Sequence, residues 1–153
     1  MKRLSIAFAL FTLSLLATPN AGAQTKVTRS VSNDAIEAVL KGMQLKYTKT
    51  EPKDKDSSMH FEFLRGDKMC RLKNYGTDIW IECIAERNLK LEDVNRWNQE
   101  AKFSRLVFIE ENKKTILSLE AQLDCVGGVT DAMIRQFITR FDEEAKRFFK
   151  FAN

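Results

Sequence analysis

The stretch that decides the fold is MHFEFLRGDKMCRLKNYGTDIWIECIA, residues 59–85. It contains three short runs typical of β-strands, residues 59–64, 68–73 and 78–85, and each ends at a polar or glycine-containing break. The first break is Arg65-Gly66-Asp67 and the second lies at residues 74–77. Because both breaks are tight, the three strands are expected to form an antiparallel meander.

Alternation along the third run separates its two faces. The predicted core face carries Ile79, Ile81 and Cys83, and the opposite face carries Trp80, Glu82 and Ile84. If the hairpin turns around Gly76, Cys70 falls opposite Cys83. A disulfide between Cys70 and Cys83 is therefore a possible cross-strand bridge, provided that the geometry allows it.

Further along the chain, residues 91–101 predict a helix with Leu91, Val94 and Trp97 on one face. Residues 105–110 and 115–123 predict a second hairpin around the turn at residues 111–114. In its second strand the set assigned to the core is Leu117, Leu119 and Ala121, against Ile116, Ser118 and Glu120.

The two ends of this region predict helices. Three candidate N-caps at residues 32–34 open a first helix that ends near Gly42 or Met43. Thr130 caps a long final helix, whose apolar stripe is Ile134, Phe137, Ile138, Phe141, Ala145 and Phe148. Residues 24–31 are expected to be a loose leader, and residues 47–58 a solvated loop. The resulting order α-β-β-β-α-β-β-α predicts an α+β fold, with an antiparallel sheet packed against helices.

The N-terminus has the pattern of a secretory signal peptide. Lys2 and Arg3 precede a mainly apolar run at residues 4–17, and Pro19-Asn20 breaks it before Ala21-Gly22-Ala23. The run is shorter than the roughly 20 residues that span a membrane. We therefore expect cleavage after Ala23, one domain over residues 24–153, a periplasmic or secreted location, and no stable membrane insertion after the signal is removed.

Composition argues against several classes of function. The formal charge of +4 falls to +2 without Lys2 and Arg3, and the remaining charges of both signs are interspersed, which does not predict nucleic-acid binding. Three cysteines lack the paired spacing of a zinc site, and His60 is the one histidine in the sequence. The sequence therefore indicates no metal and no cofactor.

His60 could act as a base beside Cys70 or Cys83 as nucleophile, but nothing in the sequence orients it. Adjacent carboxylates such as Glu143-Glu144 suit solvent better than acid-base catalysis. We therefore predict that the chain is not an enzyme, and a cysteine-dependent enzyme remains only as an alternative.

Three segments together resemble a known family. They are VNRWN at residues 94–98, the hairpin sequence LVFIEENKKTILSLEAQLDC, and GGVTDAMIRQFITRFDEEAKRFF from residue 127. Over about residues 34–149 the chain resembles the YbjN domain family of bacterial sensory transduction regulators, whose fold is similar to type III secretion chaperones. The resemblance implies a non-enzymatic domain, and such chaperones pair as dimers and hold extended segments of client proteins. They act in the cytoplasm, in contrast to the export signal of this chain.

The motif residues of this resemblance are Asn95, Trp97, Asn98, Gly127 and Gly128. The asparagines could present amides to a ligand, but the pattern favours a tie between the helix end and the next strand. The glycines could hold an anion at the N-terminus of the final helix, but a tight turn with positive φ is favoured. These residues therefore indicate structure more than activity.

Trp80, Phe149 and Phe151 lie off the expected core face. Exposed aromatic side chains are enriched where proteins meet partners, so these three are candidates for a surface that binds a protein partner or a second copy of the chain. Core packing is the competing interpretation. The leading hypothesis is an exported protein-binding or chaperone-like module, and the alternative is a small-molecule or lipid sensor with a cavity between sheet and helices.

Overall fold

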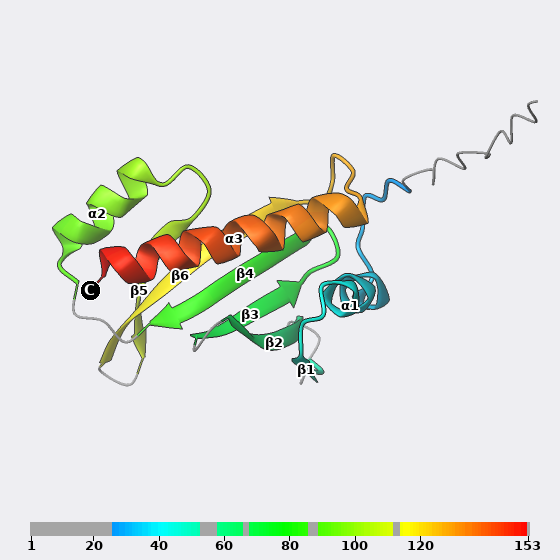
Figure 1. Ribbon diagram of the computed structural model, residues 1–153, viewed down its shortest axis with the longest axis horizontal. Helices are drawn as coiled ribbons and strands as arrows, with labels where there is room; N and C mark the ends of the chain where they lie inside the picture. The colour runs from blue at the N-terminus through cyan, green and yellow to red at the C-terminus, as the bar shows by residue number, and fades with distance from the viewer. Residues whose placement is uncertain (1–25, 53–57, 66–67, 86–88, 112–113, 153) are drawn as a thin grey trace, which may run out of the picture.

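The computed structural model describes residues 26–52, 58–65, 68–85, 89–111 and 114–152. Six antiparallel strands form one sheet in the order β1-β2-β3-β4-β6-β5, accompanied by three helices (Figure 1). In chain order the elements are α1 (Asn33–Gly42), β1 (Tyr47–Thr50), β2 (Met59–Arg65), β3 (Lys68–Asn74), β4 (Asp78–Ala85), α2 (Leu91–Glu100), β5 (Arg105–Glu111), β6 (Lys114–Asp124) and α3 (Asp131–Phe151). The predicted α+β class is confirmed.

The helices pack on one face of the sheet. Helix α3 crosses β4 and β6, α1 contacts α3, and α2 lies beside β5 (Figure 1). Trp97 of α2 also packs against Phe148 of α3, with ring centroids 5.6 Å apart. The core therefore lies between the sheet and this helical layer, and the other sheet face is not covered by a described helix.

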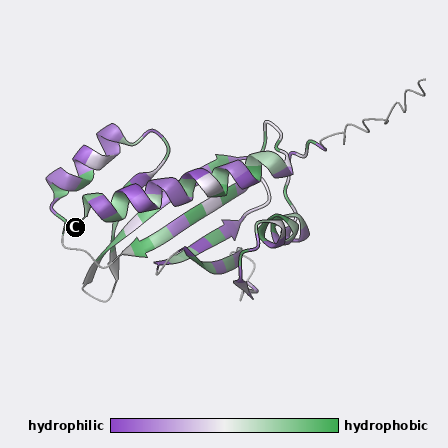
Figure 2. Ribbon diagram, viewed as in Figure 1, coloured by the Kyte–Doolittle hydropathy of each residue, from purple (hydrophilic) through white to green (hydrophobic). Residues whose placement is uncertain are grey.

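Strand alternation produces the two faces as predicted. Hydrophilic and hydrophobic residues alternate along β4 (Figure 2). The core set of β4 and the core set of β6 are both buried, namely Ile79, Ile81, Cys83, Leu117, Leu119 and Ala121. Every residue predicted for the apolar stripe of α3 is also buried. The period of two in the strands and the helical spacing of α3 thus place the same residues in the core that the sequence assigns to it.

Helix caps fix where two of the helices begin. The Ser32 side chain accepts a hydrogen bond from the Ala35 N–H at the start of α1. The Thr130 side chain accepts one from the Met133 N–H at the start of α3. Each cap satisfies a backbone donor that the first helical turn leaves without a partner.

The structure contains a strand that the sequence did not predict. Residues 47–50 of the expected loop form β1, which pairs with β2. The Tyr47 ring packs edge-on against Phe61, its hydroxyl donates to Glu37, and Lys49 lies 3.0 Å from the same carboxylate. The side chains of this edge strand are exposed or at most half-buried, so the contacts that hold it are tertiary ones that a local apolar pattern does not reveal.

Two further expectations are corrected. The described part of the 24–31 leader is not loose, since Thr28 and Val129 exchange backbone hydrogen bonds and Val31 is buried. Leu91 does not share the buried face of Val94 and Trp97 but is exposed. It is the first residue of α2, and the buried residues of this helix begin one turn later at Val94. The predicted signal peptide at residues 1–23 lies outside the described residues.

Candidate partner-binding surface

The sheet face that lies away from the helices, which we call the open face, is built from rows of side chains that cross the strands. Strand pairing puts alternate residues of neighbouring strands side by side. One row is entirely charged and runs across β2, β3, β4, β6 and β5. It consists of Glu62, Arg71, Glu82, Glu120 and Arg105. We call this set the charged row.

The carboxylates of the charged row are neutralised within the face. Arg71 lies 2.8 Å from Glu62 and 3.3 Å from Glu82, and Lys73 lies 3.1 Å from Glu82. Arg105 lies 3.3 Å from Glu120. Glu82 and Glu120 lie directly opposite each other and are only 5% and 7% exposed, so their charges would repel. The cations on the far side of each carboxylate, Arg71 and Lys73 beside Glu82 and Arg105 beside Glu120, offset this repulsion. A partner could therefore cover this row without leaving a buried carboxylate unpaired.

A second row, displaced by two residues along each strand, is mainly apolar. Leu64 lies opposite Met69, and Ser118 lies between Ile84 and Val107. On the same face, two residues beyond Val107 and Ser118 along their strands, Ile109 pairs with Ile116. We call this set, Leu64, Met69, Ile84, Val107, Ile109 and Ile116, the apolar row.

The apolar row is accessible. Leu64, Met69 and Ile84 are 58%, 52% and 42% exposed, and the remaining three are half-buried. A cluster of exposed apolar side chains beside a polar row is typical of a protein-interaction surface. Sequence reasoning placed Ile84 on this face but did not identify the row, because its members come from five strands and meet only through strand register.

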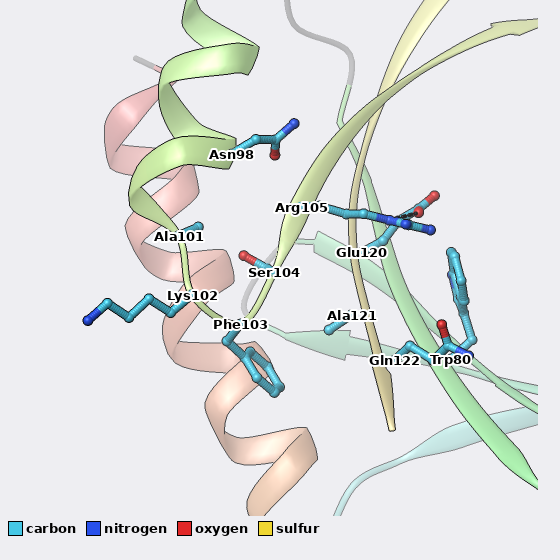
Figure 3. Close-up of a pocket in the computed structure, with 10 residues that line it drawn as sticks. All are labelled: Trp80, Asn98, Ala101, Lys102, Phe103, Ser104, Arg105, Glu120, Ala121 and Gln122. Carbon is cyan, nitrogen blue, oxygen red and sulfur yellow. Dashed lines mark hydrogen bonds and ion pairs between the residues drawn. The ribbon is translucent and has the colours of Figure 1, made fainter. Parts of the chain in front are cut away.

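A groove of about 370 Å³ lies at the end of the charged row formed by Glu120 and Arg105 (Figure 3). The Arg105 guanidinium stacks over the Trp80 ring at 5.0 Å and pairs with Glu120. Phe103 and Ser104 line the groove where β6 extends past the start of β5. Trp80 is therefore half-buried beneath Arg105 on the open face.

Sequence and structure comparisons identify the family. A family model described as "Putative bacterial sensory transduction regulator", that of YbjN, matches residues 32–152. The chain belongs to the YbjN family. Among solved structures it is similar to that titled "Crystal structure of YbjN, a putative transcription regulator from E. coli", with a TM-score of 0.63 and 12% identity over 77% of this chain and 87% of that one. At this identity the likeness shows the fold. No curated protein matches the sequence.

The motif of the YbjN resemblance on α2 has a clear place in the structure. The Asn98 side chain donates to the Leu106 carbonyl at 3.0 Å and accepts from the Leu106 N–H at 2.7 Å. Trp97 is buried between Phe148 and Phe151 and lies under the Arg147 guanidinium. Asn98 thus couples the end of α2 to β5, and Trp97 couples α2 to α3.

The other motif residues of the YbjN segment lie elsewhere. Asn95 is exposed on α2. Gly127 and Gly128 form the turn between β6 and α3, where the Gly128 N–H donates to the Cys125 carbonyl. Gly128 has φ of +99°, and a Cβ there would lie 2.7 Å from Val27. Glycine at 128 therefore satisfies both a left-handed backbone and a close contact.

The three aromatic residues predicted as a partner surface are not brought together. Trp80 lies on the open sheet face, whereas Phe149 and Phe151 lie at the end of α3 and are half-buried against the core. Phe149 packs against Phe148, and Phe151 packs against Trp97. Of the three, only Trp80 belongs to the open face of this YbjN-family fold.

The structure separates the histidine and cysteines of the alternative catalytic site. His60 lies on the open face, 4.0 Å from Glu62, whereas Cys70 and Cys83 are buried on the helix-covered face. The register prediction is confirmed, since Cys70 pairs directly with Cys83. Cys70, Cys83 and Cys125 are all in the thiol form in this structure, so the disulfide stays a prediction.

The environment of the thiols disfavours a reactive thiolate. Two effects raise the pKa of Cys70 well above 9.0. The larger is a hydrogen bond with Cys83, and the second is burial of the thiol. Burial raises the pKa of Cys125 as well. A nucleophilic cysteine needs the opposite shift.

Two features are absent from the part of the chain that the structure describes. There is no group of three or more His, Cys, Asp or Glu side chains that could hold a metal ion. In the same part of the chain, no helix has the length and apolar character needed to cross a membrane.

Proposed function

We propose that this YbjN-family chain is an exported, non-enzymatic protein-binding module with a regulatory role, and that the open sheet face binds the partner. The observation that carries the proposal is the exposed apolar row beside a charged row that is already neutralised. Burying the apolar row is favourable at about 25 cal/mol per Å². The paired carboxylates reduce the desolvation cost that usually opposes binding at a charged surface.

A second copy of the chain is the partner that we propose first. The charged row and Lys73 contain acidic and basic side chains in equal number, three of each. A two-fold axis over the face would place acids of one copy near bases of the other and would bring the two apolar rows into contact. Such a surface is self-complementary, in keeping with the dimers that the chaperone-like fold implies.

Sedimentation of the purified protein across the micromolar range tests this function. The wild-type mass should rise from monomer to dimer, and Ile84→Glu should remain monomeric because it puts a charge in the apolar row. Leu91→Glu is the matched control, since Leu91 is similarly exposed but lies on α2. A wild-type protein that stays monomeric at every concentration would exclude the second copy as partner.

The exported form is a separate part of the proposal. The signal pattern at residues 1–23 supports a mature domain of residues 24–153 in the periplasm or outside the cell. Mass spectrometry of the protein recovered from a periplasmic extract should give an N-terminus at Gln24. Recovery of the intact chain from the cytoplasm alone would reject export.

A further inference from the structure

A second cavity lies on the helix-covered side, between α3 and the ends of β2 and β3. Its volume is about 270 Å³. Its polar walls carry Arg65, Lys68, Asp142, Lys146 and Lys150, and its apolar walls carry Cys70, Ala145 and Phe149. It shares no lining residue with the groove beside Arg105 and Trp80.

The polar wall has an excess of positive charge. Asp142 is the one carboxylate among the lining residues, and Arg65 holds it through two hydrogen bonds of 2.9 and 2.6 Å. Lys146 donates a third, of 2.9 Å, to the same group. The lining side chains thus comprise four cations and one carboxylate, and that carboxylate is paired with Arg65 and Lys146.

The apolar wall is equally specific. Phe149 and Ala145 project from successive turns of α3, and Lys68 lies over the Phe149 ring at 5.0 Å. Cys70 is buried behind them, and its raised pKa keeps the thiol neutral, so it adds no negative charge. The cavity therefore combines an apolar interior with a cationic rim.

We propose that this cavity binds a small amphiphilic carboxylate, with its chain against Phe149 and Ala145 and its anionic group at the lysine rim. Pockets for drug-sized ligands start at roughly 300 Å³, so this one suits a short single chain. An uncharged chain would gain only the apolar contacts, and a cationic amphiphile would be repelled. The site is separate from the proposed self-association surface.

Isothermal titration calorimetry of the purified protein with octanoate, below its critical micelle concentration, tests the proposal. The comparison ligands are 1-octanol, octylammonium and acetate, which remove the charge, reverse it and remove the chain. Octanoate should bind at least about fivefold more tightly than each, since each lacks one of the two interactions. Equal binding of octanoate and octylammonium, or no binding of octanoate, would overturn the proposal.

Variants assign the binding to this cavity. Lys150→Gln should weaken octanoate binding about threefold, the size expected for one partly exposed charge, and should leave 1-octanol binding unchanged. Lys102→Gln is the matched control, because Lys102 is exposed but lines the other groove. Phe149→Ala should weaken octanoate and 1-octanol alike. If Lys150→Gln and Lys102→Gln bound octanoate equally well, the cavity would not be the site. Sedimentation of the wild type and of Ile84→Glu tests the proposed self-association separately, because Ile84 does not line this cavity.

Discussion

Cys70 and Cys83 lie directly opposite each other on β3 and β4, and both side chains are completely buried. The two thiols are close enough for a hydrogen bond to raise the pKa of Cys70. Because their Cα atoms are cross-strand partners, a disulfide would require little movement of the backbone.

Oxidation should therefore join these two cysteines. Because the native thiols are buried and unreactive, the reduced protein is unfolded and then refolded in a glutathione redox buffer. Titration of thiols in denaturant should then fall from three per wild-type chain to one, and for Cys125→Ser it should fall to none. The short closed loop should stabilise the fold by about 3 kcal/mol in the chain-entropy account. Cys70→Ser is the control, because it should keep both remaining thiols. A bridge that includes Cys125 would contradict the expectation.

The tie between α2 and β5 makes a prediction about stability. Asn98→Ala removes two hydrogen bonds to the backbone of buried Leu106 and should lower the free energy of unfolding by about 2 kcal/mol. Asn95→Ala should change it by less than about 0.5 kcal/mol, because Asn95 is exposed on the same helix and the two bonds to Leu106 come from Asn98. Urea unfolding of both variants measures the difference. Equal losses would show that the Asn98 contacts contribute nothing particular.

Local periodicity predicts much of this fold. The alternation in residues 78–85 places Ile79, Ile81 and Cys83 on the core face, and a single sharp turn near Gly76 is enough to bring Cys70 opposite Cys83. The stripe of α3 is likewise buried as predicted. These features succeed because each depends on residues close together in the chain and on a fixed structural period.

Features that depend on distant residues were not predictable. Residues 47–50 form β1 because Tyr47 packs on Phe61 and Lys49 reaches Glu37, and no local apolar pattern marks these contacts. The apolar row requires the register of five strands. The cavity beside Phe149 requires α3 to lie over the ends of β2 and β3, which turns a residue predicted for a partner surface into a cavity wall.

The charged row should be measurable through Glu82. Glu82→Ala leaves Arg71 with one carboxylate partner and removes the partner of Lys73, so it should lower the free energy of unfolding by about 1–3 kcal/mol. Glu100→Ala, at an exposed position on α2, should have an effect near zero. Chemical unfolding in urea measures both variants. A cost no larger than that of the control would mean that Glu82 is not stabilised by its two cations.

Asp142 should give the fold a defined sensitivity to acid. Burial alone would raise its pKa, but hydrogen bonds from Arg65 and Lys146 outweigh burial and lower the pKa below 3.8. Because the folded-state pKa lies below the unfolded value, the ionised group contributes its full stabilisation above about pH 4, and this is lost as pH falls through the folded pKa.

Asp142→Asn should therefore lower the free energy of unfolding by about 2–3 kcal/mol at neutral pH, because it leaves Arg65 without its carboxylate. The gap between wild type and variant should narrow as the pH is lowered below 3.8. Urea unfolding at a series of pH values measures that gap, with Glu143→Gln as the exposed control on the next residue of α3. A gap that stays constant down to the lowest pH would show that Asp142 is not held ionised by Arg65.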